Sequence, residues 1–187
     1  MGYVSAAFFV NEHSRYTYRA TVARYIAKVS SPLVVLIGDS NAASARDWQL
    51  TLGALRFYVS NLSSNGAKTF QTKGMVDKAI AYRPRRLITF AGTNDFCNPN
   101  FNAKDYRRDV AALADALSKA IHATGIESVA FVVPPPIKSE ICNRVRDSMR
   151  THIRDLMAGS GVAVMDIGPC VTKFGLLADR YTTDGVL

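Results

Sequence analysis

The sequence has no long apolar run, and none of its hydrophobic stretches approaches the ~20 residues that a membrane-spanning helix needs. Residues 1–10 are mildly apolar but lack the basic segment that opens a secretory signal. We interpret them as an edge segment or an arm, which leaves open secretion with a signal already removed. Internal repeats, low-complexity tracts and linkers are also missing. The 187 residues therefore predict one domain with a substantial core, in which residues 1–30 form an N-terminal arm and a helix packed on it.

Cysteine is scarce, with only Cys97, Cys142 and Cys170. No two of them have the close spacing of a metal-ligand pair. Two interpretations of the thiols stay open. Either all three are reduced, or Cys97 and Cys142 form a disulfide, because both follow predicted strands and would emerge at the same edge of a sheet.

Acidic residues are in the minority, since 23 Lys and Arg outweigh 15 Asp and Glu and give a formal net charge of +8. Such a charge attracts polyanions: nucleic acid, anionic glycans or phospholipid surfaces. However, the basic residues are spread along the chain, and zinc-finger spacing, RNA-recognition signatures and basic zippers are all missing. We interpret the charge as a solvated basic surface. A basic domain within a nucleic-acid assembly stays open as an alternative.

Apolar and amphipathic segments alternate along the chain in the order typical of βαβ units. Leu33 to Ile37 are five aliphatic residues in a row, which indicates a strand buried on both faces. Right-handed crossovers then predict an α/β fold, a three-layer α/β/α sandwich on a five-stranded parallel sheet, for which we choose the strand order 2-1-3-4-5. The predicted strands are 33–37, 56–60, 86–91, 128–133 and 162–167, and the predicted helices are 14–29, 42–55, 71–82, 103–123 and 139–158.

Polar segments follow the strands of this predicted sheet, at the edge where open α/β sheets bind their ligands. Gly38-Asp39-Ser40 ends the first strand, and further polar segments are 61–66, 92–95, 134–136 and, near the end of the chain, 184–186. Taken singly, each has a simpler interpretation. A serine after a strand is often a helix cap, and Gly or Asn often only forms a turn. Five such loops along one edge favour a site.

Acyl transfer needs a hydroxyl nucleophile and hydrogen-bond donors that face the oxyanion of a tetrahedral intermediate. Ser40 would supply the hydroxyl. The backbone N–H groups of Ser40 and Gly66, together with the Asn94 amide, would supply the donors if the loops fold inward. A side chain at position 66 would obstruct the substrate carbonyl, which suits glycine there.

These segments resemble the sequence blocks of the SGNH hydrolase family, also called GDSL esterases and lipases, from Leu33 to the C-terminus. Residues 35–40 are similar to the first block, with Ser40 as the nucleophile. Residues 61–66 and 92–95 are similar to the second and third, with Gly66 and Asn94 as oxyanion donors; residues 134–136 and the later Asn143 fit the run that follows. The resemblance implies a flavodoxin-like fold, no metal, and hydrolysis of esters or thioesters. For this chain we predict hydrolysis of small carboxylic esters or acylated glycans through an acyl-enzyme, without a cofactor.

The last block departs from the family pattern, Asp-x-x-His, whose histidine is the general base. Here Asp184-Gly185-Val186 is followed by Leu187, which cannot accept a proton, although Asp184 would still orient a histidine. Without a base, a serine hydroxyl is a poor nucleophile. Three explanations stay open: an altered last residue, a non-catalytic member that binds acylated glycans or serves as a structural module, or a base from elsewhere, for which His13 is the candidate.

Overall fold

The computed structural model describes residues 33–43, 58–124, 126–173 and 176–177. Its centre is a five-stranded sheet in the order β2-β1-β3-β4-β5, in which every neighbouring pair is parallel. The predicted α/β class and strand order are therefore confirmed. The strands are β1 (Val34–Gly38), β2 (Val59–Asn61), β3 (Arg86–Phe90), β4 (Ser128–Val133) and β5 (Ala163–Asp166).

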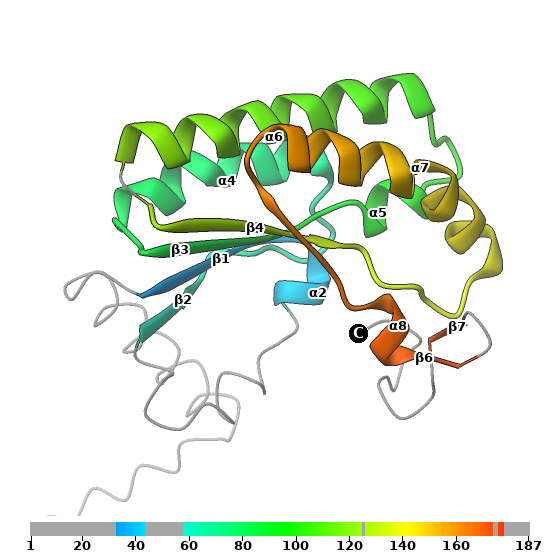
Figure 1. The fold of residues 1–187 in the computed structure, drawn as a ribbon. Helices are drawn as coiled ribbons and strands as arrows, with labels where there is room; N and C mark the ends of the chain where they lie inside the picture. Colours follow the sequence, from blue (N-terminus) through cyan, green and yellow to red (C-terminus); the bar gives the residue numbers. More distant parts are fainter. Residues whose placement is uncertain (1–32, 44–57, 125, 174–175, 178–187) are drawn as a thin grey trace, which may run out of the picture.

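Three long helices cover one face of this sheet (Figure 1). They are α4 (Thr69–Ala81), α6 (Ala103–Thr124) and α7 (Glu140–Gly159), close to the predicted bounds. The predicted helix 14–29 and most of the predicted helix 42–55 lie outside the described residues. The described part of the latter is α2 (Ser40–Ala43), which begins two residues earlier than predicted.

Short elements that the sequence did not predict complete the described chain. They are α5 (Thr93–Phe96), α8 (Gly168–Val171) and an antiparallel pair, β6 (Thr172–Lys173) with β7 (Leu176–Leu177). Each helix of one turn follows the carboxyl end of a strand, since α5 follows β3 and α8 follows β5. These short helices therefore shape the edge of the sheet where ligands bind in open α/β folds.

The main core lies between the sheet and the three long helices. On α6 the fully buried side chains recur every three or four residues, which turns one stripe of the helix toward the sheet. In β1 the consecutive residues Val35, Leu36 and Ile37 are all buried, so this strand is covered on both faces and tolerates an unbroken apolar run instead of an alternating one. Core residues with 0% exposure are Val35, Ile37, Ala79, Leu87, Val110, Leu113, Leu117, Phe131, Ile153 and Met157.

Gly38 closes β1 in a conformation that only glycine fits. Its φ is +146°, and a Cβ atom there would lie 2.0 Å from the backbone oxygen of Phe90 on β3. Directly after it, the Asp39 N–H donates to that same Phe90 oxygen over 3.1 Å. The close approach of the two strands thus fixes the point at which the chain leaves β1 and begins α2.

Within the part of the chain that the structure describes, no helix combines the length and the apolar character needed to cross a membrane.

Candidate active site

Ser40 stands where the sequence places it, immediately beyond the carboxyl end of β1. It is the first residue of α2 and is half-buried. The first N–H groups of a helix have no acceptor within the helix. No carbonyl group of α2 therefore occupies the Ser40 N–H, which can donate to an oxygen of a ligand. The position therefore combines a hydroxyl with a backbone donor at the edge of the sheet.

The loop that contains Gly66 is tied directly to this turn. The Ser64 N–H donates to the Gly38 oxygen over 2.9 Å, and the Asn61 side-chain amide donates to the Ala42 oxygen over 2.7 Å. The second bond joins β2 to the helix that begins at Ser40. Residues 61–66 are thus held beside the start of α2.

Asn94 lies on α5, and its side chain reaches the same loop. Its Nδ2 donates to the Ala67 oxygen, directly after Gly66, over 3.0 Å. A second link lies close by, one residue after Asn94 and two after Ala67, where the backbone N–H and the hydroxyl of Thr69 each donate over 2.9 Å to Asp95. A primary amide carries two hydrogens, so the bond to Ala67 leaves the second hydrogen of Asn94 for another acceptor.

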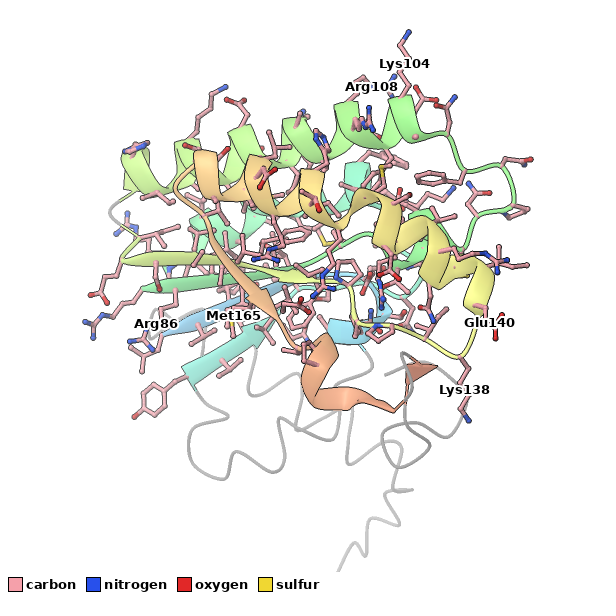
Figure 2. All side chains as sticks on the ribbon, turned by 45° about the vertical axis from the view of Figure 1, so that its right-hand side comes forward. Arg86, Lys104, Arg108, Lys138, Glu140 and Met165 are labelled. Carbon is pink, nitrogen blue, oxygen red and sulfur yellow. A yellow bond between two sulfur atoms is a disulfide. The ribbon has the colours of Figure 1, made fainter. Side chains whose placement is uncertain are left out.

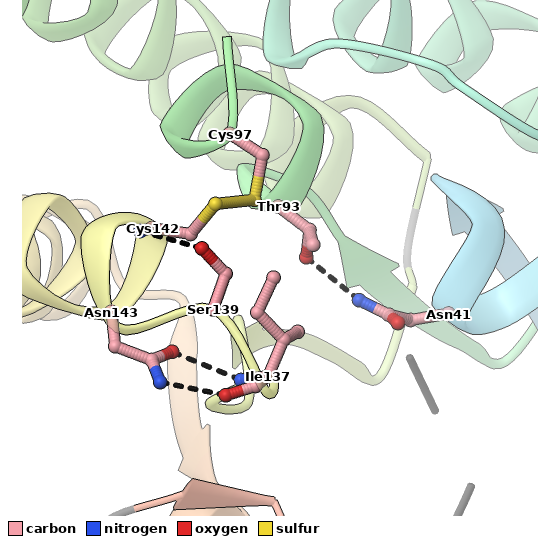
Figure 3. The surroundings of a disulfide bond; sticks show 7 residues. All are labelled: Asn41, Thr93, Cys97, Ile137, Ser139, Cys142 and Asn143. Carbon is pink, nitrogen blue, oxygen red and sulfur yellow. Dashed lines mark hydrogen bonds between the residues drawn. A yellow bond between two sulfur atoms is a disulfide. The ribbon is translucent and has the colours of Figure 1, made fainter. Parts of the chain in front are cut away.

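A third link closes the triangle between the Ser40 turn and the Asn94 turn. Asn41 Nδ2 donates to Thr93 Oγ1 over 2.7 Å, as Figure 3 shows. The sequence analysis did not single out Asn41 or Thr93. Their positions beside Ser40 and Asn94 were the available signal, since short polar side chains at such turns bond to neighbouring loops. The structure therefore brings the segments of Ser40, Gly66 and Asn94 together at one edge.

Gly66 is exposed and has a φ of +74°, in the left-handed region that favours glycine. A Cβ atom added there would meet no other protein atom within 4 Å. Glycine is therefore needed here for its backbone conformation rather than for lack of room. The open space beside it is compatible with the prediction that a side chain at this position would meet substrate.

Two buried carboxyl groups underlie the edge. Burial raises the pKa of Asp39, while hydrogen bonds from Asn41 and Thr93 partly oppose the shift. Burial likewise raises the pKa of Asp95, against the two hydrogen bonds from Thr69. Asp39 Oδ1 accepts the Asn41 N–H over 3.0 Å. Both groups therefore hold the turns in place, and neither has a described contact that would make it a proton carrier for substrate.

Cys97 and Cys142 form a disulfide, with their Cα atoms 4.8 Å apart (Figure 3). The prediction of a Cys97–Cys142 bridge is therefore confirmed, and the alternative, in which all three cysteines are reduced, is wrong. Cys97 directly follows α5, and Cys142 lies in the first turn of α7. The bridge therefore anchors the turn that carries Asn94 to a long helix of the scaffold.

Asn143, the next residue, secures the loop between β4 and α7. Its Oδ1 accepts the Ile137 N–H over 2.9 Å, and its Nδ2 donates to the Ile137 oxygen over 2.7 Å. The backbone N–H and C=O of the buried Ile137 are thus both hydrogen-bonded to the Asn143 side chain, which is itself buried. This explains in physical terms why an asparagine suits that position.

Asp184, Leu187 and His13 lie outside the described residues. Their predicted roles stay predictions. Across the described ranges, no group of three or more His, Cys, Asp and Glu side chains could hold a metal ion.

The model of the GDSL-like Lipase/Acylhydrolase family matches residues 17–186, nearly the whole chain. The chain belongs to this family. The predicted membership of the SGNH or GDSL hydrolases is thereby confirmed, and ester hydrolysis is the class of activity that membership supports. None of the functionally curated proteins matches the chain in sequence.

Solved structures of a lipase and two esterases share the fold at low sequence identity. A GDSL-like lipase from Bacteroides thetaiotaomicron is 19% identical with a TM-score of 0.66, over 94% of this chain and 89% of that one. An acetyl xylan esterase variant from Geobacillus stearothermophilus is 12% identical with a TM-score of 0.56, over 82% and 85%. A carbohydrate esterase of family 3 from Talaromyces cellulolyticus is 16% identical with a TM-score of 0.57, over 82% and 86%. At these identities the likeness shows the fold alone.

Proposed function

We propose that this GDSL-family chain is a single-domain serine esterase, in which Ser40 is the nucleophile. The observation that carries the proposal is the hydrogen-bonded triangle of loops. Asn41 joins the Ser40 turn to the Asn94 turn, Asn94 joins its turn to the Gly66 loop, and Ser64 joins that loop back to β1. Three segments that are distant in sequence thereby share one edge of the sheet.

In the proposed reaction, Ser40 Oγ attacks the carbonyl carbon of the ester and its proton passes to a base. The carbonyl oxygen becomes an oxyanion, which accepts hydrogen bonds from the N–H groups of Ser40 and Gly66 and from Asn94. The alcohol then leaves with the proton, and water hydrolyses the acyl-enzyme by the same route. Where one such donor has been removed from an enzyme, the loss is about 3–4 kcal/mol of transition-state stabilisation.

The base is the incomplete part of this machinery. Asp184 is proposed to orient a histidine at position 187, where this sequence has leucine. Loss of a triad member costs several orders of magnitude, although oxyanion stabilisation and binding leave a residual rate of about 10³–10⁴ over water. We therefore expect only this slow residual turnover from the sequence as it stands, and Ser40-dependent turnover once position 187 is a histidine.

We propose small or exposed carboxylic esters as substrates, such as O-acetylated sugars or soluble acyl esters. This class is supported by the names of two structures that share the fold, an acetyl xylan esterase and a carbohydrate esterase.

Leu187 favours one alternative, a non-catalytic member of the family that binds acylated glycans or serves as a structural module. Such a chain would keep the fold and the loops at the sheet edge. It would bind an acylated sugar without any turnover that depends on Ser40.

Hydrolysis of p-nitrophenyl acetate by four proteins separates the two functions: the chain as it stands, Ser40→Ala, Leu187→His, and the double variant. We expect Leu187→His to raise the rate at least a hundredfold, and Ser40→Ala to abolish that gain. Equal rates for Leu187→His and the double variant would contradict the esterase. If binding of an acetylated sugar persisted in that case, the non-catalytic alternative would hold.

A further inference from the structure

A cavity of about 280 Å³ lies at the carboxyl ends of β4 and β5. Val133, Pro134 and Pro136 of the segment that leaves β4 form one wall. Asp166, Gly168 and Pro169 from the end of β5 and α8 form another, and Arg146, Asp147 and Arg150 of α7 form the third. Figure 2 labels Glu140 at the start of α7 and Met165 on β5; the cavity lies against the middle of α7 and the end of β5.

The cavity adjoins the turn that carries Asn94. A Cβ atom at Gly92, two residues before Asn94, would lie 2.9 Å from Cγ of Pro134. Pro134 therefore packs against the start of the Asn94 turn on one side and lines the cavity on the other. Of the residues proposed for ester hydrolysis, the three that the structure describes, Ser40, Gly66 and Asn94, do not line it.

Arg146 is the chemically incomplete residue of this cavity. Its side chain is only 11% exposed, and its Nη1 is buried without a hydrogen-bond partner. Its Nε and Nη2 both donate to a single oxygen of Asp147, over 3.0 and 2.6 Å. A buried donor without an acceptor costs free energy. Nη1 itself has almost no accessible surface, so an acceptor brought by a ligand has to draw the guanidinium toward the cavity, and pairing there would remove that cost.

The two carboxylates that line the cavity leave this donor unmatched. Asp166 is already occupied, because Arg150 donates to its Oδ2 and the Gly168 N–H donates to its Oδ1. Asp147 is 54% exposed, so its ion pair with Arg146 is screened by solvent and worth little. The two N–H groups of Arg146 Nη1 thus have no acceptor, and the positive charge of the guanidinium is only weakly compensated.

We propose that this cavity binds an oxyanion, the carboxylate or phosphate of a small acidic molecule, with Arg146 as the principal donor and Arg150 beside it. Guanidinium groups recognise carboxylate and phosphate oxygens through paired N–H donors. The volume lies just below the range of about 300–1,000 Å³ of drug-sized sites, which suits one acidic group with the ring or short chain that carries it. This inference goes beyond ester hydrolysis and does not depend on it.

Titration calorimetry of the full chain tests the proposal, with inorganic phosphate, D-glucuronate and neutral D-glucose as probes at matched ionic strength. We expect saturable one-to-one binding of at least one acidic probe and none of glucose. Binding of phosphate alone or of glucuronate alone identifies which oxyanion the cavity takes. Absence of saturable binding for both acidic probes would overturn the proposal.

Two pairs of variants on α7 locate the binding. Arg146→Lys keeps the charge but loses the paired donors, so it should weaken binding about tenfold or more. The exposed Arg154→Lys is its control and should change nothing. Asp147→Asn frees Arg146 from its competing carboxylate and should tighten binding about fivefold, unlike the charge-matched and exposed Asp155→Asn. Equal affinities within both pairs would overturn the proposal.

The Asp147 pair keeps the test decisive if Arg146→Lys proves too unstable to fold, because both aspartates are exposed. Binding is measured without turnover. A failure of Ser40-dependent hydrolysis would therefore leave this site unaffected, and a failure of oxyanion binding would leave the proposed esterase unaffected.

Discussion

The Cys97–Cys142 disulfide gives the sharpest stability prediction. The bridge spans 45 residues and joins the end of α5 to the first turn of α7. The enclosed segment includes α6 and β4, which form much of the core. Breaking the bond frees this long loop in the unfolded chain, so unfolding becomes more favourable even though the folded contacts remain.

The magnitude follows from the loop length. The chain-entropy relation for a loop of 45 residues gives about 4 kcal/mol at 25 °C. In domains of about 150–250 residues, 1 kcal/mol corresponds to roughly 2–4 °C in Tm, so reduction should lower Tm by about 8–16 °C.

Differential scanning calorimetry with and without dithiothreitol measures this shift. Cys170→Ala keeps the bridge and should respond to the reductant like the original chain. The double variant Cys97→Ala, Cys142→Ala should already melt at the lower temperature and show no response. An original chain that melts at the same temperature in both buffers would refute the reasoning, as would a double variant that still responds to dithiothreitol.

Three further predictions concern single residues of the edge and its scaffold. Burial raises the pKa of Asp39 above its ordinary 3.8, so ionisation of this carboxyl group opposes folding. The free energy of unfolding should therefore fall as the pH rises from about 4 toward neutrality, and it should fall less steeply in Asp39→Asn. Urea titrations of both proteins at about pH 4 and 7 check this. Asn143→Ala leaves both polar groups of Ile137 buried without a partner and should cost about 2–6 kcal/mol in urea unfolding, whereas the exposed Asn100→Ala should cost almost nothing. In the Leu187→His protein, Asn94→Ala should lower the Ser40-dependent kcat for p-nitrophenyl acetate by about 10²–10³, and a rate within a factor of three of the Leu187→His protein would remove Asn94 from the proposed oxyanion hole.

Elements with a strong periodic pattern were predictable from the sequence. The prediction of a strand at 128–133 matches β4 in full, and the predicted helix 103–123 differs from α6 by one residue. Both segments carry several apolar residues in the pattern of one kind of secondary structure, a short apolar run in the strand and a spacing of three or four residues in the helix. α5 has a single turn and no repeat, so residues 92–95 looked like a loop.

The candidate site was predictable in its members but not in its connections. Ser40, Gly66 and Asn94 each follow a strand, so parallel topology alone brings them to one edge. The bonds that fix them to one another arise from Asn41, Asn61 and the Ala67 oxygen, whose partners are set by tertiary packing rather than by local pattern. The disulfide had the same ambiguity, since the choice between free and bonded thiols depends on how close α5 comes to α7.

Phosphonylation by a fluorophosphonate tests the central claim, that the Ser40 hydroxyl faces the donors at the sheet edge, most directly. Peptide mass spectrometry of the Leu187→His variant should find one equivalent of label on the peptide that contains Ser40, and the Ser40→Ala double variant should remain unlabelled. Label on a different serine, or no label on either protein, would contradict the account.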